Sequence, residues 1–196
     1  MTPDPFRRFI PEDLEAALRE GIGRALSMGA AGAEAFVQVS RSRKAKVQNG
    51  ALEDLSASKR GGLGVRVLRE GGGGLRAGIA TSTDLAQTDF TGLFRQAWDL
   101  SELGDADPWI RQADPAGSDD LPPRYDPRAD SLAPEDRIRR ALELEAEARK
   151  ASASVAAVRE AAWSDGSGAS LLLTDKGVRS SDLASSCSAR IELAVE

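Results

Sequence analysis

Period-two alternation of apolar side chains dominates residues 33–82, and it restricts this part of the chain to a β-rich fold. Glycine-containing breaks divide the alternating region into short runs. The pattern predicts an antiparallel meander with strands at residues 33–48, 51–60, 63–70 and 74–82. Asn49-Gly50 is typical of a two-residue type I′ turn, because both positions need positive φ. Gly71 to Gly74 predicts a second, looser turn.

The glycine-rich stretch "GGLGVRVLREGGGG" at residues 61–74 invites comparison with phosphate-binding loops. A dinucleotide fingerprint requires G-x-G-x-x-G between a strand and a helix. Here Val67 stands where the third glycine would be, and the next residues alternate like a strand. No Gly-Lys-Ser or Gly-Lys-Thr follows any glycine run, so a Walker loop is excluded. We interpret these glycines as turn residues.

Helical spacing appears in three places. The first helix is predicted to start near Pro11, with leucine and isoleucine every four residues. Gly21 and Gly23 within it predict close packing of another element. The second helix is predicted over residues 88–100 with Thr88 as its cap.

A third helix is predicted from Pro134 to about Ala151. Its expected inward residues are Ile138, Ala141 and Leu142, and its expected outward pairs are Glu135/Arg139, Asp136/Arg140 and Glu145/Arg149.

The remaining segments complete a predicted α+β fold, an antiparallel β-meander sheet with packed helices. We expect one domain: helix, meander and helix over residues 1–101, an extended strap over 102–133, and helix plus strands over 134–196. The last part predicts three strands, broken at 165–168 and at 175–177. Because the sequence stops in the middle of a strand pattern, we expect the native polypeptide to continue past Glu196.

Composition excludes several kinds of chemistry. The chain has no histidine, which removes Ser-His-Asp and Cys-His catalysis and all histidine metal sites. Cys187 is the one cysteine, so no intrachain disulfide can form, and we expect a small core residue rather than a nucleophile. No signal-peptide pattern and no long apolar stretch occur, which predicts a cytoplasmic protein.

Charge argues against a general nucleic-acid binder, since the net charge is −5 and the pI about 5.0. The one basic cluster comprises Arg41, Arg43, Lys44 and Lys46. We interpret it as the solvated face of a strand.

An ordered set of motifs resembles the N-terminal domain of the TldD/PmbA family, once called modulators of DNA gyrase. The set comprises Glu34 after the first helix, "NGALE" at 49–53, "GLGVRV" at 62–67, "TSTDL" at 81–85, "LLLTDKGVRSSD" at 171–182 and "SSCSARIELAVE" at 185–196. The "TSTDL" and "SSC" segments look closer to the PmbA branch.

The resemblance implies cytoplasmic peptidases about twice this long, which act on short or poorly structured peptides. In the TldD branch a zinc site lies beyond this domain, so we expect no cofactor, catalytic residue or metal ligand here. Zinc would belong to a downstream domain or a sister subunit. The expected partners are a second copy or a TldD-like subunit and an unstructured peptide, with no membrane or direct nucleic-acid contact.

Three functional hypotheses stay open from the sequence. The first is a peptide-binding and assembly domain that holds an extended peptide as an added strand. The second is a non-enzymatic module that modulates DNA gyrase. The third is a free-standing enzyme using carboxylates or a Ser58/Lys59 pair.

The candidate peptide-binding residues are Arg66, Thr81, Thr83 and Asp84. Arg66 faces either a groove or water. The other three residues suit either substrate contact or a local helix cap.

Overall fold

The computed structural model describes residues 4–86, 88–115 and 122–196. The chain divides into two compact units. The first unit comprises Met1–Val39, Arg60–Pro122 and Ala169–Asp182, and the second comprises Ser40–Lys59, Pro123–Gly168 and Leu183–Glu196.

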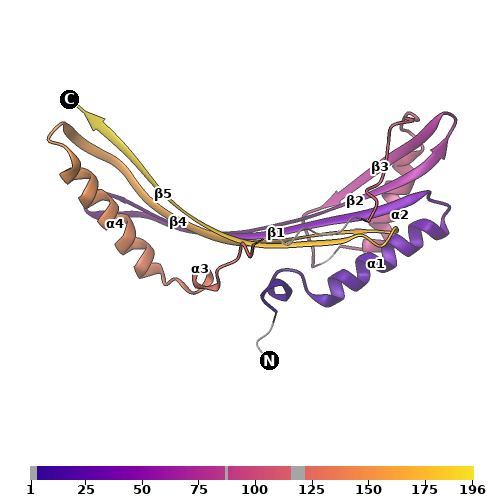
Figure 1. The fold of residues 1–196 in the computed structure, drawn as a ribbon, viewed down its shortest axis with the longest axis horizontal. Coiled ribbons are helices and arrows are strands. Elements are labelled where there is room, and N and C mark those ends of the chain that lie inside the picture. Colours follow the sequence, from indigo (N-terminus) through magenta and orange to yellow (C-terminus); the bar gives the residue numbers. More distant parts are fainter. Residues whose placement is uncertain (1–3, 87, 116–121) are drawn as a thin grey trace. The chain divides into compact units, whose positions relative to one another are not determined.

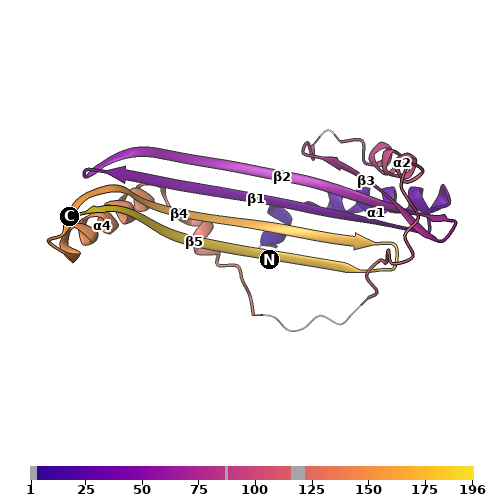
Figure 2. The ribbon, with the colours of Figure 1, turned by 90° about the horizontal axis from the view of Figure 1, so that it is seen from above.

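Five strands form one antiparallel sheet in the order β3-β2-β1-β4-β5, which Figure 2 shows from above. The strands are β1 (Gly32–Gln48), β2 (Ala51–Gly71), β3 (Gly74–Ser82), β4 (Val155–Thr174) and β5 (Arg179–Val195). Short 3₁₀ turn η1 (Pro5–Arg8) precedes the helices α1 (Glu12–Ser27), α2 (Phe90–Ser101), α3 (Pro127–Ser131) and α4 (Pro134–Ala151), labelled in Figure 1. The predicted α+β class with an antiparallel sheet and packed helices is confirmed.

Two predicted strand breaks are wrong. Residues 51–60 and 63–70 belong to the single strand β2, and β4 runs without interruption through residues 165–168. A Cβ at Gly61 would lie 3.2 Å from Leu85 Cδ1, and a Cβ at Gly166 would lie 2.7 Å from the carbonyl oxygen of Arg41. Glycine at these positions therefore gives room to a neighbouring group rather than turning the chain.

The turn between β1 and β2 is confirmed at Asn49-Gly50, whose φ angles are 54° and 74°. Helix α4 holds this turn in place. The Gly50 N–H donates to Glu145 Oε2 at 2.9 Å, and Arg149 Nη2 donates to Asn49 Oδ1 at 3.2 Å. The turn is thus fixed by backbone conformation and by a carboxylate from a helix distant in sequence.

In the first unit, α2 packs against both α1 and β3. A Cβ at Gly21 would lie 2.3 Å from the ring of Phe94, so glycine admits the α2 aromatic ring against α1. A Cβ at Gly78 would lie 1.9 Å from the carbonyl oxygen of Ala97, so α2 lies directly on β3. The predicted close packing is confirmed at Gly21 and wrong at Gly23, which has nothing within 4 Å.

The start of α2 differs from its prediction. The helix begins at Phe90, and the N-cap is Asp89, whose carboxylate accepts the Gly92 N–H at 2.9 Å. Thr88 instead lies before the helix, where its hydroxyl is 2.7 Å from Ser82 Oγ. A carboxylate one residue later thus performs the capping assigned to Thr88.

In the second unit, α4 packs on β1 and β4 through an apolar cluster. Its buried members are Val47, Ala141, Val158 and Ala161, and the partly buried residues around them are Leu142, Leu144, Ala148, Val155, Trp163 and Ile191. The inward residues Ala141 and Leu142 are as predicted, but the prediction missed Arg137 and Glu145, which are both 2% exposed. Glu145 therefore faces the core, although the charge pattern placed it outward with Arg149.

In the first unit, Glu15 on α1 forms ion pairs with three arginine side chains. Its carboxylate oxygens lie 2.9 Å from Arg7 Nη1, Arg19 Nη2 and Arg179 Nε. The hydrogen bond from Arg179 lowers the pKa most, burial raises it, and Arg19 and Arg7 lower it further; the net result is a pKa of about 2. Arg179 begins β5, so this cluster ties the first helix to the edge strand.

We expect the stability of the chain to fall in acid because of Glu15. Its folded pKa is below the ordinary value, so its stabilisation is complete above about pH 4.5 and is lost as pH falls toward 2. The side chain is 10% exposed, but its partners are 30–49% exposed, and we expect a loss of roughly 1–3 kcal/mol.

Urea unfolding at pH 7 and pH 3 would measure this loss. Glu15→Gln should lower stability at pH 7 and flatten the pH dependence, whereas Glu12→Gln, at a carboxylate 84% exposed, should behave like the wild type. If the free energy of unfolding of Glu15→Gln fell between pH 7 and pH 3 as much as that of the wild type, Glu15 would not be the source of the acid sensitivity.

Gly50→Val is expected to destabilise the chain by about 1 kcal/mol or more, because a β-branched residue is strained at a φ of 74°. Gly72→Val is the matched control, since Gly72 has open space and no positive φ. Urea midpoints compare the two variants, and equal midpoints would refute the turn assignment.

Candidate binding site

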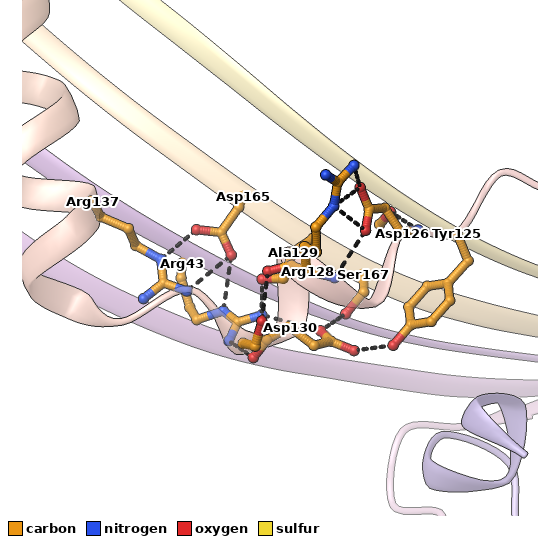
Figure 3. A network of polar contacts seen from close by, with 11 residues as sticks. Arg43, Tyr125, Asp126, Arg128, Ala129, Asp130, Arg137, Asp165 and Ser167 are labelled. Atoms are coloured by element: carbon orange, nitrogen blue, oxygen red, sulfur yellow. Dashed lines mark hydrogen bonds and ion pairs between the residues drawn. The ribbon is translucent and has the colours of Figure 1, made fainter. Parts of the chain in front are cut away.

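Asp165 forms the centre of a polar network inside the second unit (Figure 3). This β4 residue has a side chain 2% exposed and receives two guanidinium groups. Arg137 from α4 donates from Nη2 to Oδ1 at 3.1 Å and also from Nε to Oδ2. Arg43 from β1 places its Nε 3.2 Å from Oδ1. One carboxylate thus links a helix and two strands.

Asp130 at the end of α3 extends the network. It accepts hydrogen bonds from Ser167 Oγ and from Tyr125 OH, the latter at 2.6 Å, and it pairs with Arg43 Nη2 at 3.1 Å. Burial alone would raise the pKa of Asp130, but the bonds from Ser167 and Tyr125 and the charge of Arg43 outweigh it. The pKa therefore lies below its ordinary value.

A pocket of about 510 Å³ lies beside this network. It is lined by Pro123, Arg124, Tyr125, Asp126, Arg128, Ala129, Leu132, Arg140, Trp163, Asp165, Ser185, Ser186 and Cys187. Residues 124–126 are fastened to β5, because Ser185 N–H donates to the Arg124 carbonyl at 3.0 Å and Asp126 N–H donates to Ser185 Oγ at 2.8 Å. We call this cavity the strap pocket.

Two of the predicted binding residues line a second, smaller pocket in the first unit. Its volume is about 410 Å³, and its lining residues are Thr81, Ser82, Asp84, Thr88, Asp89, Gly92, Leu93 and Gln96. Thr83 is not among them. The Asp84 carboxylate accepts the Ala86 N–H at 3.1 Å, so it supports the local turn, while Asp89 caps the helix.

Arg66 lies apart from that pocket. Its Nε is 2.8 Å from Glu34 Oε1 in an ion pair whose side chains are 31% and 19% exposed. A longer contact of 3.4 Å joins its Nη2 to the carbonyl of Arg111. The structure thus brings Thr81 and Asp84 together and gives Arg66 a carboxylate partner of its own.

The basic cluster and the cysteine also differ from their predictions. Lys44 lies 3.2 Å from Glu160, Lys46 lies 3.1 Å from Glu53, and Arg43 is part of the buried network, so these cations are paired rather than simply solvated. Cys187 is exposed instead of buried, because the polar "SSC" segment lies in the outermost strand β5.

Within the described residues, no group of three acidic, cysteine or histidine side chains could hold a metal ion. The donor set does not fit zinc, since histidine is absent and the one thiol is isolated. None of the described helices is both long and apolar enough for a membrane span.

Residues 33–101 match the family model described as PmbA/TldA metallopeptidase domain 1, so this stretch of the chain is similar to that domain. Among curated proteins, none matches the sequence.

Three solved structures share the fold. TldE from Thermococcus kodakarensis has a TM-score of 0.75 at 16% identity, over 93% of this chain and 39% of its own. Two proteins are described as a "putative modulator" of DNA gyrase. The one from Thermotoga maritima MSB8 has a TM-score of 0.79 at 14% identity, over 94% of this chain and 40% of its own. The one from Bacteroides thetaiotaomicron VPI-5482 has a TM-score of 0.80 at 20% identity, over 95% of this chain and 42% of its own. This chain therefore spans about two fifths of the length of these structures.

Sequence reasoning missed the strap pocket. The available signals were the buried-strand pattern around "WSDGSG" at 163–168, which places polar side chains inside an apolar strand, and the aromatic residue Tyr125 within a proline-rich stretch. The sequence instead predicted a strand break at 165–168 and an extended strap over 102–133, which includes Tyr125. The meaning of both signals depends on Arg43 and Arg137, which are distant in sequence.

Asp165→Asn is expected to destabilise the chain by about 3 kcal/mol, because Arg137 is 3% exposed and would lose its charged partner in the core. Asp136→Asn is the matched control, since Asp136 is 43% exposed and pairs with Arg139 at the surface. It should cost less than about 0.5 kcal/mol. Denaturant unfolding measures both, and equal stabilities would show that the network does not support the fold.

Proposed function

We propose that this chain is domain 1 of a TldD/PmbA-type peptidase system, of the PmbA branch, that acts on short or unstructured peptides. Its role is to hold an extended peptide, to contribute to a chamber that encloses the peptide, and to assemble with other subunits. The match over residues 33–101 and the shared fold support this proposal. We place peptide hydrolysis in a downstream domain or a sister subunit, because the residues of this chain do not fit a zinc site.

The observation that carries the peptide-binding role is the outer edge of β2 in the second unit. Strand β3 pairs with β2 only from Leu63 to Gly71. Residues Ala51–Lys59 have β1 on one side, and no described strand pairs with them on the other. Every residue in this segment is exposed, including Leu52 and Leu55.

Such an edge can bind a peptide without specialised side chains. An unpaired strand edge offers a row of N–H and C=O groups, which an added strand satisfies through backbone hydrogen bonds. The exposed side chains of Leu52 and Leu55 would add apolar contact. This mode suits peptides of varied sequence and needs no histidine.

Assembly with a second copy or with a TldD-like sister subunit is part of the proposal. The first unit exposes large apolar side chains, notably Leu103 at 82%, Trp109 at 80% and Ile79 at 58%. We infer that a partner subunit covers these side chains in the assembled protein, because burial of apolar surface is favourable. Zinc, where the system uses it, would be held by a downstream domain or by the sister subunit.

A gyrase-directed interaction module is the second candidate function. Its support is that two structures of the same fold are described as modulators of DNA gyrase. The net charge of −5 favours contact with protein rather than with DNA. A supercoiling assay with purified gyrase distinguishes this candidate from peptide binding.

An unstructured ten-residue peptide is expected to bind the 196-residue chain and to shift the backbone amide NMR signals of Ala51–Lys59. The same peptide N-methylated at every residue is the control, because it has no backbone N–H to donate to the strand edge. We expect it to bind at least about tenfold more weakly, since several backbone bonds of roughly 0.5–1.5 kcal/mol each are lost. Equal binding of both peptides would contradict the edge-strand mode.

Mass spectrometry of the same mixture with added zinc tests the non-catalytic role. We expect intact peptide and no stoichiometric metal. Steady cleavage that a chelator abolishes would overturn this part of the proposal.

A further inference from the structure

The strap pocket contains one arginine, Arg140, for which no described residue supplies a carboxylate partner. Arg140 of α4 lies over the indole of Trp163 from β4, with its guanidinium carbon 4.8 Å from the ring centroid. Among the described residues it makes no hydrogen bond or ion pair, and its Nε is buried without an acceptor. The Trp163 Nε1 is buried without an acceptor as well.

The neighbouring charges are already paired. Arg128 binds Asp126 at 2.7 Å, and Arg43 and Arg137 share Asp165. On the helix itself, Asp136 is bonded to Arg139 at 3.0 Å, and the charge of Arg140 contributes only weakly to its lowered pKa. Both carboxylates of the pocket lining, Asp126 and Asp165, are thus engaged by other arginines, so an anion from outside the chain can pair with Arg140.

The rest of the lining restricts the kind of anion. Pro123, Ala129 and Leu132 contribute apolar surface, and Tyr125 and Trp163 contribute aromatic rings. A volume of about 510 Å³ is within the range of small-ligand sites and fits one or two amino-acid residues. A fully hydrated inorganic anion would leave the apolar surface without a partner. The lining therefore fits a carboxylate attached to an apolar group.

We propose that the strap pocket binds the free C-terminal carboxylate of a peptide whose last side chain is apolar. Arg140 pairs with the carboxylate, because a guanidinium can donate two parallel hydrogen bonds to it. The indole of Trp163 holds the guanidinium in position and contacts the apolar side chain. The choice of a peptide rests on the proposed function, whereas the preference for a carboxylate beside an apolar group rests on the pocket alone.

The test uses N-acetyl-leucine and its uncharged amide as probes of the 196-residue chain. The chain has three tryptophans, so a ¹⁵N-labelled sample gives three indole signals, and Trp163→Phe identifies the relevant one. We expect the acid to shift the Trp163 signal and the amide to need at least about a tenfold higher concentration. Equal titrations of acid and amide would overturn the proposal.

Two variants assign the effect to one side chain. Arg140→Gln should weaken acid binding at least about tenfold, and Arg140→Lys should restore part of it by keeping the charge. Arg139→Gln is the matched control, because Arg139 is 57% exposed and paired with Asp136 and Glu143. An equal loss in Arg139→Gln, or none in Arg140→Gln, would overturn the role of Arg140. Dispersed amide spectra confirm that each variant is folded.

Longer peptides separate this inference from the proposed function. If a longer peptide shifts the amide signals of Ala51–Lys59 and binds equally well as acid and as amide, the carboxylate site is overturned and the edge-strand function is supported. Acid-selective binding at Trp163 without any shift in Ala51–Lys59 supports the pocket and counts against the edge-strand mode.

Discussion

The second unit depends on the buried carboxylate of Asp165. A charge removed from water costs several kcal/mol unless partners compensate it, so β4 can carry Asp165 only where guanidinium groups reach it. Arg43 comes from the neighbouring strand β1, and Arg137 comes from α4. The second partner fixes the rotation of the helix about its axis, because Arg137 must face the sheet.

The other contacts of α4 follow from that rotation. Residues four apart lie on one face of a helix, so turning Arg137 inward also turns Ala141 and Glu145 inward. Ala141 is small enough to pack on Val158 and Val47. Glu145 then meets the turn at Gly50, whose free N–H it accepts at 2.9 Å. One buried ion pair and one bonded turn therefore anchor the helix near its two ends.

Local chemistry explains which parts of this fold could be predicted from the sequence. Asn49-Gly50 was predictable because positive φ at adjacent residues is a property of the dipeptide itself. Gly166 was not, because its role is to let the Arg41 carbonyl approach, and that carbonyl is distant in sequence. The inward side of α4 was predicted only in part, since Ala141 and Leu142 do pack in the apolar cluster. Apolar spacing could not reveal the buried charges Arg137 and Glu145, because their partners Asp165 and Gly50 lie on other elements. Of the candidate site, Thr81 and Asp84 were brought together, but the strap pocket depends on contacts between segments that no local pattern reveals.

The distribution of paired charges also bears on function. A cation with a carboxylate neighbour is largely neutralised, and Arg43, Lys44, Lys46 and Arg137 are all in this state. Arg140 follows Arg137 by three residues, which places it on the flank of the inward face of the helix, so it reaches Trp163 rather than Asp165. The rotation that satisfies the buried carboxylate thus leaves one stacked guanidinium beside an apolar cavity. Among the described residues, Arg140 has an aromatic ring beside it but no acceptor, and the anion proposed for the strap pocket would supply that acceptor.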